Sequence, residues 1–355
     1  MPIWWPFPVL AAFLFAAWFT PVARWLAIRF GAIDCPDGDR HLHKVPTPLF
    51  GGLGMIVSFF LVTSIVLATS NALTSGAITV WHFVGFFGGM GVLTVGGIFD
   101  DRYKLSAKYL LGFIVIASVL AVLGGIDVAK MTNPFGGAFV LPSILASVVA
   151  LVWIFSMTIT TKLLDGVEGL ASSVSAIAAL MIAALALTPT YFQSDVALLS
   201  LIFAGAILGF ILWNWYPAHV FLGESGSTVL GFTVGVLSVI AGSKMATALL
   251  VFGIPAIDVA LVVVRRVWAG KNPFTTADRR HAHLMLRDAG LAPWMVTVIY
   301  GTVVTMFGIT TLVFERWQKV IVLAVLTVFS AIGIVLLARH TAKNAVKTLD
   351  GRSVL

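Results

Sequence analysis

Long apolar runs separated by short polar segments recur along the whole chain. Each run is about as long as the roughly 20 residues that a helix needs to cross the hydrocarbon core of a bilayer. Eleven runs meet this description, near residues 4–23, 50–68, 80–98, 109–125, 139–158, 169–188, 196–213, 225–243, 246–264, 294–314 and 319–338. The pattern predicts an all-α fold, a polytopic transmembrane bundle of about 11 helices that forms a single domain over residues 1–355.

The composition agrees with this pattern. Of the 355 residues, 59% are hydrophobic and only 10% are charged, which is far from the usual composition of a soluble domain. In such a chain the net charge of +7 indicates topology, so we expect no nucleic-acid partner. The single cysteine, Cys35, excludes an intrachain disulfide and a cysteine-cluster metal site.

Lysine and arginine residues are unevenly distributed between the two sides that the spans define. Eighteen lie in the alternate segments 24–49, 99–108, 159–168, 265–293 and 339–355, whereas Lys130, Lys244, Arg316 and Lys319 lie on the other side. The positive-inside rule makes the richer side cytoplasmic. We therefore expect a multi-pass protein of the inner (plasma) membrane, with its N-terminus outside and its C-terminus in the cytoplasm.

Acidic residues gather on the same side, although the positive-inside rule does not require it. Asp100 and Asp101 follow the third span, Asp165 and Glu168 lie in a glycine-containing turn after the fifth, and Glu224 opens the eighth. A carboxylate beside hydrocarbon is costly and is commonly functional. Adjacent carboxylates stay ionised only beside a cation, and oxygen ligands favour Mg²⁺, with Mn²⁺ as an alternative. Plain helix caps and turns are the competing interpretation.

Basic residues in the same segments suit a phosphorylated ligand. The candidates are Lys44, Lys108, Lys162, Arg279 and Arg280. The arginines offer forked donors that match a diphosphate, although a positive-inside anchor explains them as well. His281 and His283 share a face only in an extended chain, so their spacing does not by itself imply that both bind a metal.

Two features inside spans need separate interpretation. The glycine run 88–97 has no strand before it, so it indicates close helix packing rather than a dinucleotide loop. Asp258 is either part of a proton path or a buried acid satisfied by Arg265 or Lys108. A transporter, the rival class, predicts charges at the membrane midplane and an inverted repeat, whereas the polar residues here crowd one interface.

The ordered motifs resemble the polyprenyl-phosphate N-acetylhexosamine-1-phosphate transferase family over nearly the whole chain. They are the Asp-Asp loop that ends in Leu-Ser-Ala-Lys (105–108), Asp-Gly-x-x-Gly-Leu (165–170), and Asn214 followed by Phe-Leu-Gly-Glu-Ser-Gly-Ser (221–227). The segment 278–283 resembles the N-acetylglucosamine-type branch more than the branch that uses the muramyl-pentapeptide nucleotide.

This resemblance implies transfer of an N-acetylhexosamine 1-phosphate, in this branch N-acetylglucosamine 1-phosphate, from a UDP-sugar to undecaprenyl phosphate. UMP is released in this first membrane step of cell-envelope glycan synthesis. The resemblance implies Mg²⁺ as cofactor, Asp100 and Asp101 as the catalytic pair, and Asp101 and Glu224 as metal ligands. It implies substrate contacts by Lys44, Lys108, Lys162, Asp165, Glu168, Asn214, Arg279, Arg280, His281 and His283. A homodimer is a further expectation.

Five site positions depart from the family pattern. The family usually has Asn at the positions of Ile159 and Lys162, Asp at those of Glu168 and Glu224, and His at that of Leu284. Glu carries its carboxylate about one methylene further than Asp, and Mg²⁺ demands strict geometry at roughly 2.1 Å. Lys162 adds an ammonium that is able to pair with phosphate or to replace part of the metal's charge. The alternative is a catalytically silent homologue that binds polyprenyl phosphate.

Overall fold

The computed structural model describes residues 3–36, 45–76, 78–133, 136–240, 245–270, 281–314 and 316–352, with 132, 316 and 339–352 as backbone only. Its helices are α1 (Pro6–Phe30), α2 (Gly52–Thr69), α3 (Val80–Tyr103), α4 (Ala107–Leu123), α5 (Ser143–Leu164), α6 (Leu170–Ala186), α7 (Ser194–Asn214), α8 (Gly223–Ile240), α9 (Met245–Val251), α10 (Gly253–Trp268), α11 (Ala282–Asp288), α12 (Pro293–Val313) and α13 (Arg316–Arg352). A short 3-10 helix, η1, covers Pro189–Tyr191. The strands are β1 (Ile33–Asp34), β2 (Thr47–Pro48), β3 (Lys130–Thr132) and β4 (Ala138–Val140).

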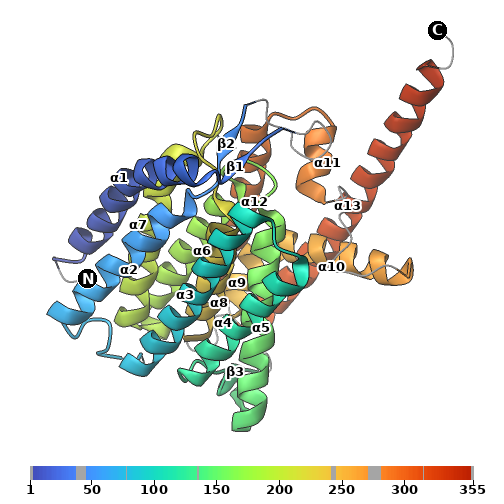
Figure 1. Cartoon of the computed structure of the whole chain (residues 1–355). Coiled ribbons are helices and arrows are strands. Elements are labelled where there is room, and N and C mark those ends of the chain that lie inside the picture. The colour runs from blue at the N-terminus through green and yellow to red at the C-terminus, as the bar shows by residue number, and fades with distance from the viewer. Residues whose placement is uncertain are drawn as a thin grey trace.

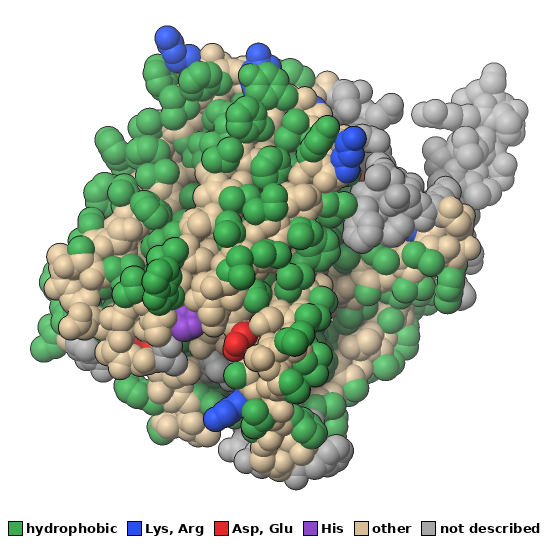
Figure 2. Space-filling model, turned by 60° about the horizontal axis from the view of Figure 1, so that its bottom comes forward, with side chains coloured by type: hydrophobic (Ala, Val, Ile, Leu, Met, Phe, Trp, Pro, Cys, Tyr) green, Lys and Arg blue, Asp and Glu red, His purple; other side chains and the backbone are tan. Residues whose placement is uncertain are grey.

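Apolar helices dominate the described part of the chain and confirm the all-α membrane fold. Eight are long and apolar enough to cross a membrane, α9 with α10 makes a ninth if the bent pair counts as one span, and α4 and α6 are shorter apolar helices. Each predicted span therefore corresponds to a helix or a broken helix. Figure 2 shows a face on which hydrophobic side chains are spread over the helices with few charged groups among them, as a surface against lipid requires.

One predicted span, 246–264, is broken rather than continuous. α9 and α10 meet at 78°, and α10 leaves the bundle sideways (Figure 1). Pro255 lies in the first turn of α10. In a continuous helix its ring would collide with the carbonyl group of Val251, four residues earlier. The proline therefore gives a physical reason for the break.

The segments that carry the predicted site meet at one end of the bundle. β1 pairs antiparallel with β2, with Asp34 opposite Thr47. This ribbon lies at the same end as α11, whereas β3 lies at the opposite end (Figure 1). The described parts of the segments that carry the predicted site thus gather at one end, while the side of the membrane that this end faces remains a prediction.

Glycines in α3 allow close approach of neighbouring helices, as the run 88–97 predicts. A Cβ at Gly89 would lie 2.8 Å from the carbonyl oxygen of Ala117 in α4, and one at Gly97 would lie 2.2 Å from the backbone nitrogen of Ser225 in α8. Neither contact leaves room for a side chain. The approach at Gly97 brings the next turn of α3, which carries Asp101, beside the start of α8.

Candidate active site

A cavity of about 370 Å³ opens where the predicted site segments meet. Its walls come from the β1–β2 ribbon, the end of α3, the α5–α6 turn, the start of α8 and the α11–α12 region. The charged side chains that line it, among the described residues, are Asp34, Asp100, Asp101, Asp165, Glu168 and Glu224, with Lys104, Lys162 and Arg287. Acidic side chains thus outnumber cationic ones on these walls, an arrangement that suits a bound cation.

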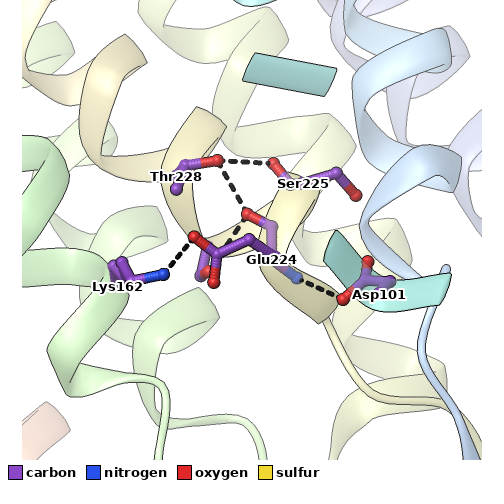
Figure 3. Close-up of polar contacts among 6 residues, drawn as sticks. Asp101, Lys162, Glu224, Ser225 and Thr228 are labelled. Atoms are coloured by element: carbon purple, nitrogen blue, oxygen red, sulfur yellow. Dashed lines mark hydrogen bonds and ion pairs between the residues drawn. The ribbon is translucent and has the colours of Figure 1, made fainter. Parts of the chain in front are cut away.

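Asp101 fixes the start of α8. Its Oδ1 accepts a hydrogen bond from the backbone N–H of Glu224 at 2.9 Å (Figure 3). The first turn of a helix leaves such N–H groups unpaired, so Asp101 acts as a cap supplied by another helix. Its Oδ2 is buried and has no hydrogen-bond partner in the described structure. An unpaired buried acceptor is costly, and a cation would relieve that cost.

Backbone hydrogen bonds to the start of α2 hold the loop before α8. The N–H of Gly51 donates to the carbonyl of Phe221 at 3.0 Å, and that of Gly52 donates to Leu222 at 2.9 Å. Gly223 follows with a φ of 76°, and a Cβ there would lie 2.3 Å from the Leu49 carbonyl oxygen. Glycine is required at this position because it alone adopts this conformation without a clash. The motif thereby delivers Glu224 into the cavity.

Lys162 and Glu224, two of the residues that depart from the family pattern, contact each other. The Lys162 ammonium, near the end of α5, donates to Oε1 of Glu224 (Figure 3). The side chains are 24% and 13% exposed, respectively. The ion pair is therefore shielded from much of the solvent. Its two charges interact more strongly in this position than they would at an open surface.

The α5–α6 turn supplies two more carboxylates. Asp165 is exposed to the cavity. The partial loss of hydration among the cavity walls and the nearby Glu224 carboxylate raise its pKa to about 7, against the opposing effect of Lys162. Glu168 accepts the N–H of Ala218 at 2.8 Å. Its carbonyl group accepts the Thr297 hydroxyl at 3.0 Å. Glu168 therefore ties this turn to the α7–α8 loop and to α12.

Asn214 uses both ends of its side-chain amide within the protein. Its Oδ1 accepts the Ser172 hydroxyl at 2.8 Å, and its Nδ2 donates to the Val220 carbonyl at 3.1 Å. Asn214 is buried, and it lines the cavity. The structure thus shows it shaping the loop that leads to Glu224, whereas its contact with a nucleotide remains a prediction.

The two histidines lie at the start of α11 and are not among the residues that line the cavity. His281 is the N-cap residue and His283 is in the first turn, and their buried rings stack with centroids 5.6 Å apart. A Cβ at Gly166 would lie 2.8 Å from Nε2 of His283, so this ring lies against the α5–α6 turn. Burial lowers the pKa of His283 to about 4, and neither ring nitrogen has a partner among the described residues.

Besides the two histidines, four predicted substrate-binding residues are not placed at the cavity. Lys44, Arg279 and Arg280 lie outside the residues that the structure describes. Lys108 is exposed, and its ammonium lies 5.0 Å from the centre of the Tyr109 ring rather than on the cavity wall. The structure therefore gives Lys108 no contact with the other site residues, and its predicted role in binding is unsupported.

The motif order along the cavity agrees with the similarity of the chain to known proteins. The model of glycosyl transferase family 4 matches residues 83–242. A decaprenyl-phosphate N-acetylglucosaminephosphotransferase from Mycolicibacterium smegmatis is 31% identical, with 91% of this chain and 86% of the relative covered. The chain belongs to glycosyl transferase family 4, which includes the polyprenyl-phosphate N-acetylhexosamine-1-phosphate transferases.

Two further relatives come from different branches. A probable undecaprenyl-phosphate N-acetylglucosaminyl 1-phosphate transferase from Bacillus subtilis is 28% identical over 88% of this chain and 86% of its own length. A phospho-N-acetylmuramoyl-pentapeptide-transferase from Halalkalibacterium halodurans is 29% identical over 84% and 92%, respectively. The family resemblance thus extends over most of the chain.

This family member offers Mg²⁺ a partial set of ligands. No group of three or more His, Cys, Asp or Glu side chains in the described ranges is arranged to hold a metal ion. Mg²⁺ usually keeps several waters and takes one or two carboxylates together with substrate phosphates, so such a group is not required. Asp101, with its unpaired Oδ2, and Asp100 beside it suit this role. Glu224 would join them once its carboxylate leaves Lys162.

The sequence motifs alone do not select three charged residues of the cavity wall. Lys104 lies close behind the Asp-Asp pair and is the easiest to find, because it shares that motif. Arg287 comes from the last turn of α11, and it donates to the carbonyl of Leu291, in the α11–α12 turn, at 3.0 Å. Asp34 enters through the short pairing of β1 with β2, for which two-residue strands leave no periodic signal.

Proposed function

We propose that this protein transfers an N-acetylhexosamine 1-phosphate, in particular N-acetylglucosamine 1-phosphate, from a UDP-sugar to undecaprenyl phosphate or a related polyprenyl phosphate. The names of the Bacillus and Mycolicibacterium relatives support this acceptor and sugar. The observation that carries the proposal is the convergence of Asp100, Asp101, Asp165 and Glu224 on one cavity at the end of a membrane bundle. Anionic phosphates enter such a cavity together with a cation.

In the proposed reaction an oxygen of the lipid phosphate attacks the β-phosphorus of the UDP-sugar. A bond forms between them as the bond from the β-phosphorus to the oxygen bridging to the α-phosphorus breaks. The products are a polyprenyl diphosphate sugar and UMP, so no further reactant is needed. Because the second pKa of a phosphate monoester is near 6, the attacking oxygen is largely deprotonated at neutral pH, and positioning matters more than basicity.

We assign separate roles in phosphate, metal and sugar binding to the residues of the cavity. Asp100 orients the lipid phosphate, while Lys104, Lys162 and Arg287 offer cationic contacts to the phosphates. Mg²⁺, when held by Asp101 and Asp100 with Glu224, supplies positive charge that offsets the charge on the leaving UMP. We assign the diphosphate and sugar to the α11 side of the cavity, near His281 and His283, with Arg279 and Arg280 preceding them in the sequence.

The activity is tested by UMP release from purified protein supplied with undecaprenyl phosphate and UDP-N-acetylglucosamine, with and without Mg²⁺. Asp101→Asn keeps an oxygen for the Glu224 N–H but removes the negative charge, so we expect a loss of about a hundredfold or more. Asp127→Asn, an exposed site between α4 and β3, is the matched control and retains release. Full turnover by Asp100→Asn would remove Asp100 from the mechanism.

The ion pair between Lys162 and Glu224 gives the silent-homologue alternative a specific basis, because it occupies a proposed metal ligand. Binding of undecaprenyl phosphate without UMP release from any of several UDP-N-acetylhexosamines would favour that alternative. Mg²⁺-dependent release would establish the transferase and show that both departures are compatible with catalysis.

We place the cavity end in the cytoplasm and the protein in the inner membrane, on the strength of the lysine and arginine distribution. Cys35 is the single cysteine of the chain and is exposed, beside β1. A membrane-impermeant maleimide should therefore label it in inverted vesicles but not in intact cells, and the reverse pattern would invert the proposed topology. Self-association into a homodimer is proposed on the resemblance alone, and light scattering of the purified protein tests it.

A further inference from the structure

The Glu224 carboxylate is already paired with a cationic side chain of the same protein. The Lys162 ammonium contacts its Oε1, and its backbone N–H is held by Asp101. A few atoms away, Asp101 Oδ2 is buried without a partner among the described residues, and the residue as a whole is only 5% exposed. The cavity thus combines one unpaired carboxylate oxygen with one carboxylate that is neutralised by a lysine of the same chain.

The ion pair offsets repulsion between neighbouring carboxylates. Glu224 interacts unfavourably with the carboxylates of Asp100, Asp101 and Asp165. Lys162 offsets this repulsion in the absence of any ligand. Removing one partner of a shielded ion pair leaves an uncompensated charge, which costs far more than the pair itself contributes. A divalent cation that binds to Glu224 without an anion would leave the Lys162 ammonium without a partner. An anion that binds without the cation would be repelled by the carboxylates.

We infer that Lys162 occupies Glu224 until an anion takes over its ammonium, so that a divalent cation and a nucleoside diphosphate bind this cavity cooperatively. The anion gives Lys162 a new partner, and the Glu224 carboxylate becomes available to the cation. Each ligand thereby removes the cost that the other would meet alone. This inference rests on the proposed function for the identity of the anion, and it concerns binding rather than turnover.

The test is a binding measurement on the whole protein in detergent or nanodiscs. Free Mn²⁺ is followed by electron paramagnetic resonance with and without UDP, and a protein-free titration corrects for the Mn²⁺ that UDP itself binds. In the native protein UDP should tighten Mn²⁺ binding by about tenfold or more, within the usual range of coupling between two sites. In Lys162→Asn the Mn²⁺ affinity without UDP should rise, and the effect of UDP should shrink by a similar factor.

Lys104→Asn is the matched control because Lys104 also lines the cavity but is not the hydrogen-bonded partner of Glu224. Its backbone is left-handed, with a φ of 52°, a conformation that Asn tolerates. This variant should bind UDP more weakly while keeping the coupling between UDP and Mn²⁺. Glu224→Gln adds a second route if Lys162→Asn does not fold, since it frees the ammonium and should tighten UDP binding without metal.

Unchanged Mn²⁺ affinity and unchanged coupling in Lys162→Asn would overturn the inference, as would a native protein in which UDP and Mn²⁺ bind independently or Mn²⁺ fails to bind at all. If Lys162→Asn is unfolded, an unaltered UDP affinity in folded Glu224→Gln overturns it instead. Parallel assays of UMP release keep the two ideas separate. Coupled binding without release contradicts the proposed function alone, and release without coupling contradicts this inference alone.

Discussion

Asp258 of α10 and His281 at the start of α11 are joined by a buried hydrogen bond. His281 Nδ1 lies 2.9 Å from one carboxylate oxygen of Asp258, and the other oxygen accepts the N–H of Ala282 at 2.9 Å. Asp258 therefore caps the helix that carries both histidines. Of the two interpretations of Asp258, the satisfied buried acid is the one observed, but its partners are His281 and Ala282 rather than Arg265 or Lys108.

Replacing Asp258 should disturb the histidines without touching the cavity wall. Asp258→Asn removes the charge from two hydrogen bonds, and charge-assisted bonds of this kind contribute about 1.5–3 kcal/mol each. We expect a lower melting temperature and at least a tenfold loss of UMP release. Asp127→Asn, at the exposed site between α4 and β3, again serves as the control. Native release and an unchanged melting temperature in Asp258→Asn would show that this anchor is dispensable.

The close approach of α3 to α8 should make Gly97 sensitive to a single methyl group. Gly97→Ala places a Cβ 2.2 Å from the Ser225 nitrogen, whereas a Cβ at Gly91 of the same helix meets nothing within 4 Å. Displacement of α8 would weaken the hydrogen bond from the backbone N–H of Glu224 to Asp101. We expect Gly97→Ala to lower the unfolding temperature and UMP release, and Gly91→Ala to be neutral or slightly stabilising because Ala favours helix by up to about 1 kcal/mol. Equal behaviour of the two variants would refute this packing argument.

The sequence predicts the helices well because lipid imposes one rule on every span, a continuous apolar run. The same criterion does not detect the break between α9 and α10, because the residues on both sides of the break are apolar. Pro255 is the one local signal that the helix is interrupted there. The motif order also predicts which carboxylates converge. The sequence does not reveal the ion pair between Lys162 and Glu224, whose partners lie 62 residues apart, or the bond between Asp258 and His281. Such long-range pairs are decided by how helices pack, not by local patterns.

The low pKa of His283 predicts that acid destabilises the protein. Its folded-state pKa of about 4 lies below the unfolded value of 6.5, so between these values the unfolded chain binds more protons. Stability therefore rises with pH, and the contribution that is present above pH 6.5 is lost as the pH falls toward 4, amounting to about 3 kcal/mol. Melting curves from pH 8 to 4 should show this slope. His283→Gln should flatten it, whereas His219→Gln, at an exposed histidine, should not.

The raised pKa of Asp165 predicts that activity falls as the pH is lowered. Its effect on stability runs the other way, because the contribution of Asp165 to stability is lost as the pH rises. Its pKa is raised to about 7 from 3.8, so below pH 7 the carboxyl is protonated and the cavity attracts a cation less strongly. UMP release should fall as the pH drops from 8 to 6, and higher Mg²⁺ should move this fall to lower pH, because a bound cation favours the carboxylate. The folded protein, by contrast, loses the contribution of the protonated form to stability as the pH rises through 7. Asp165→Asn should remove the fall in activity near pH 7. A limb near 7 that persists in Asp165→Asn would assign the titration to another group.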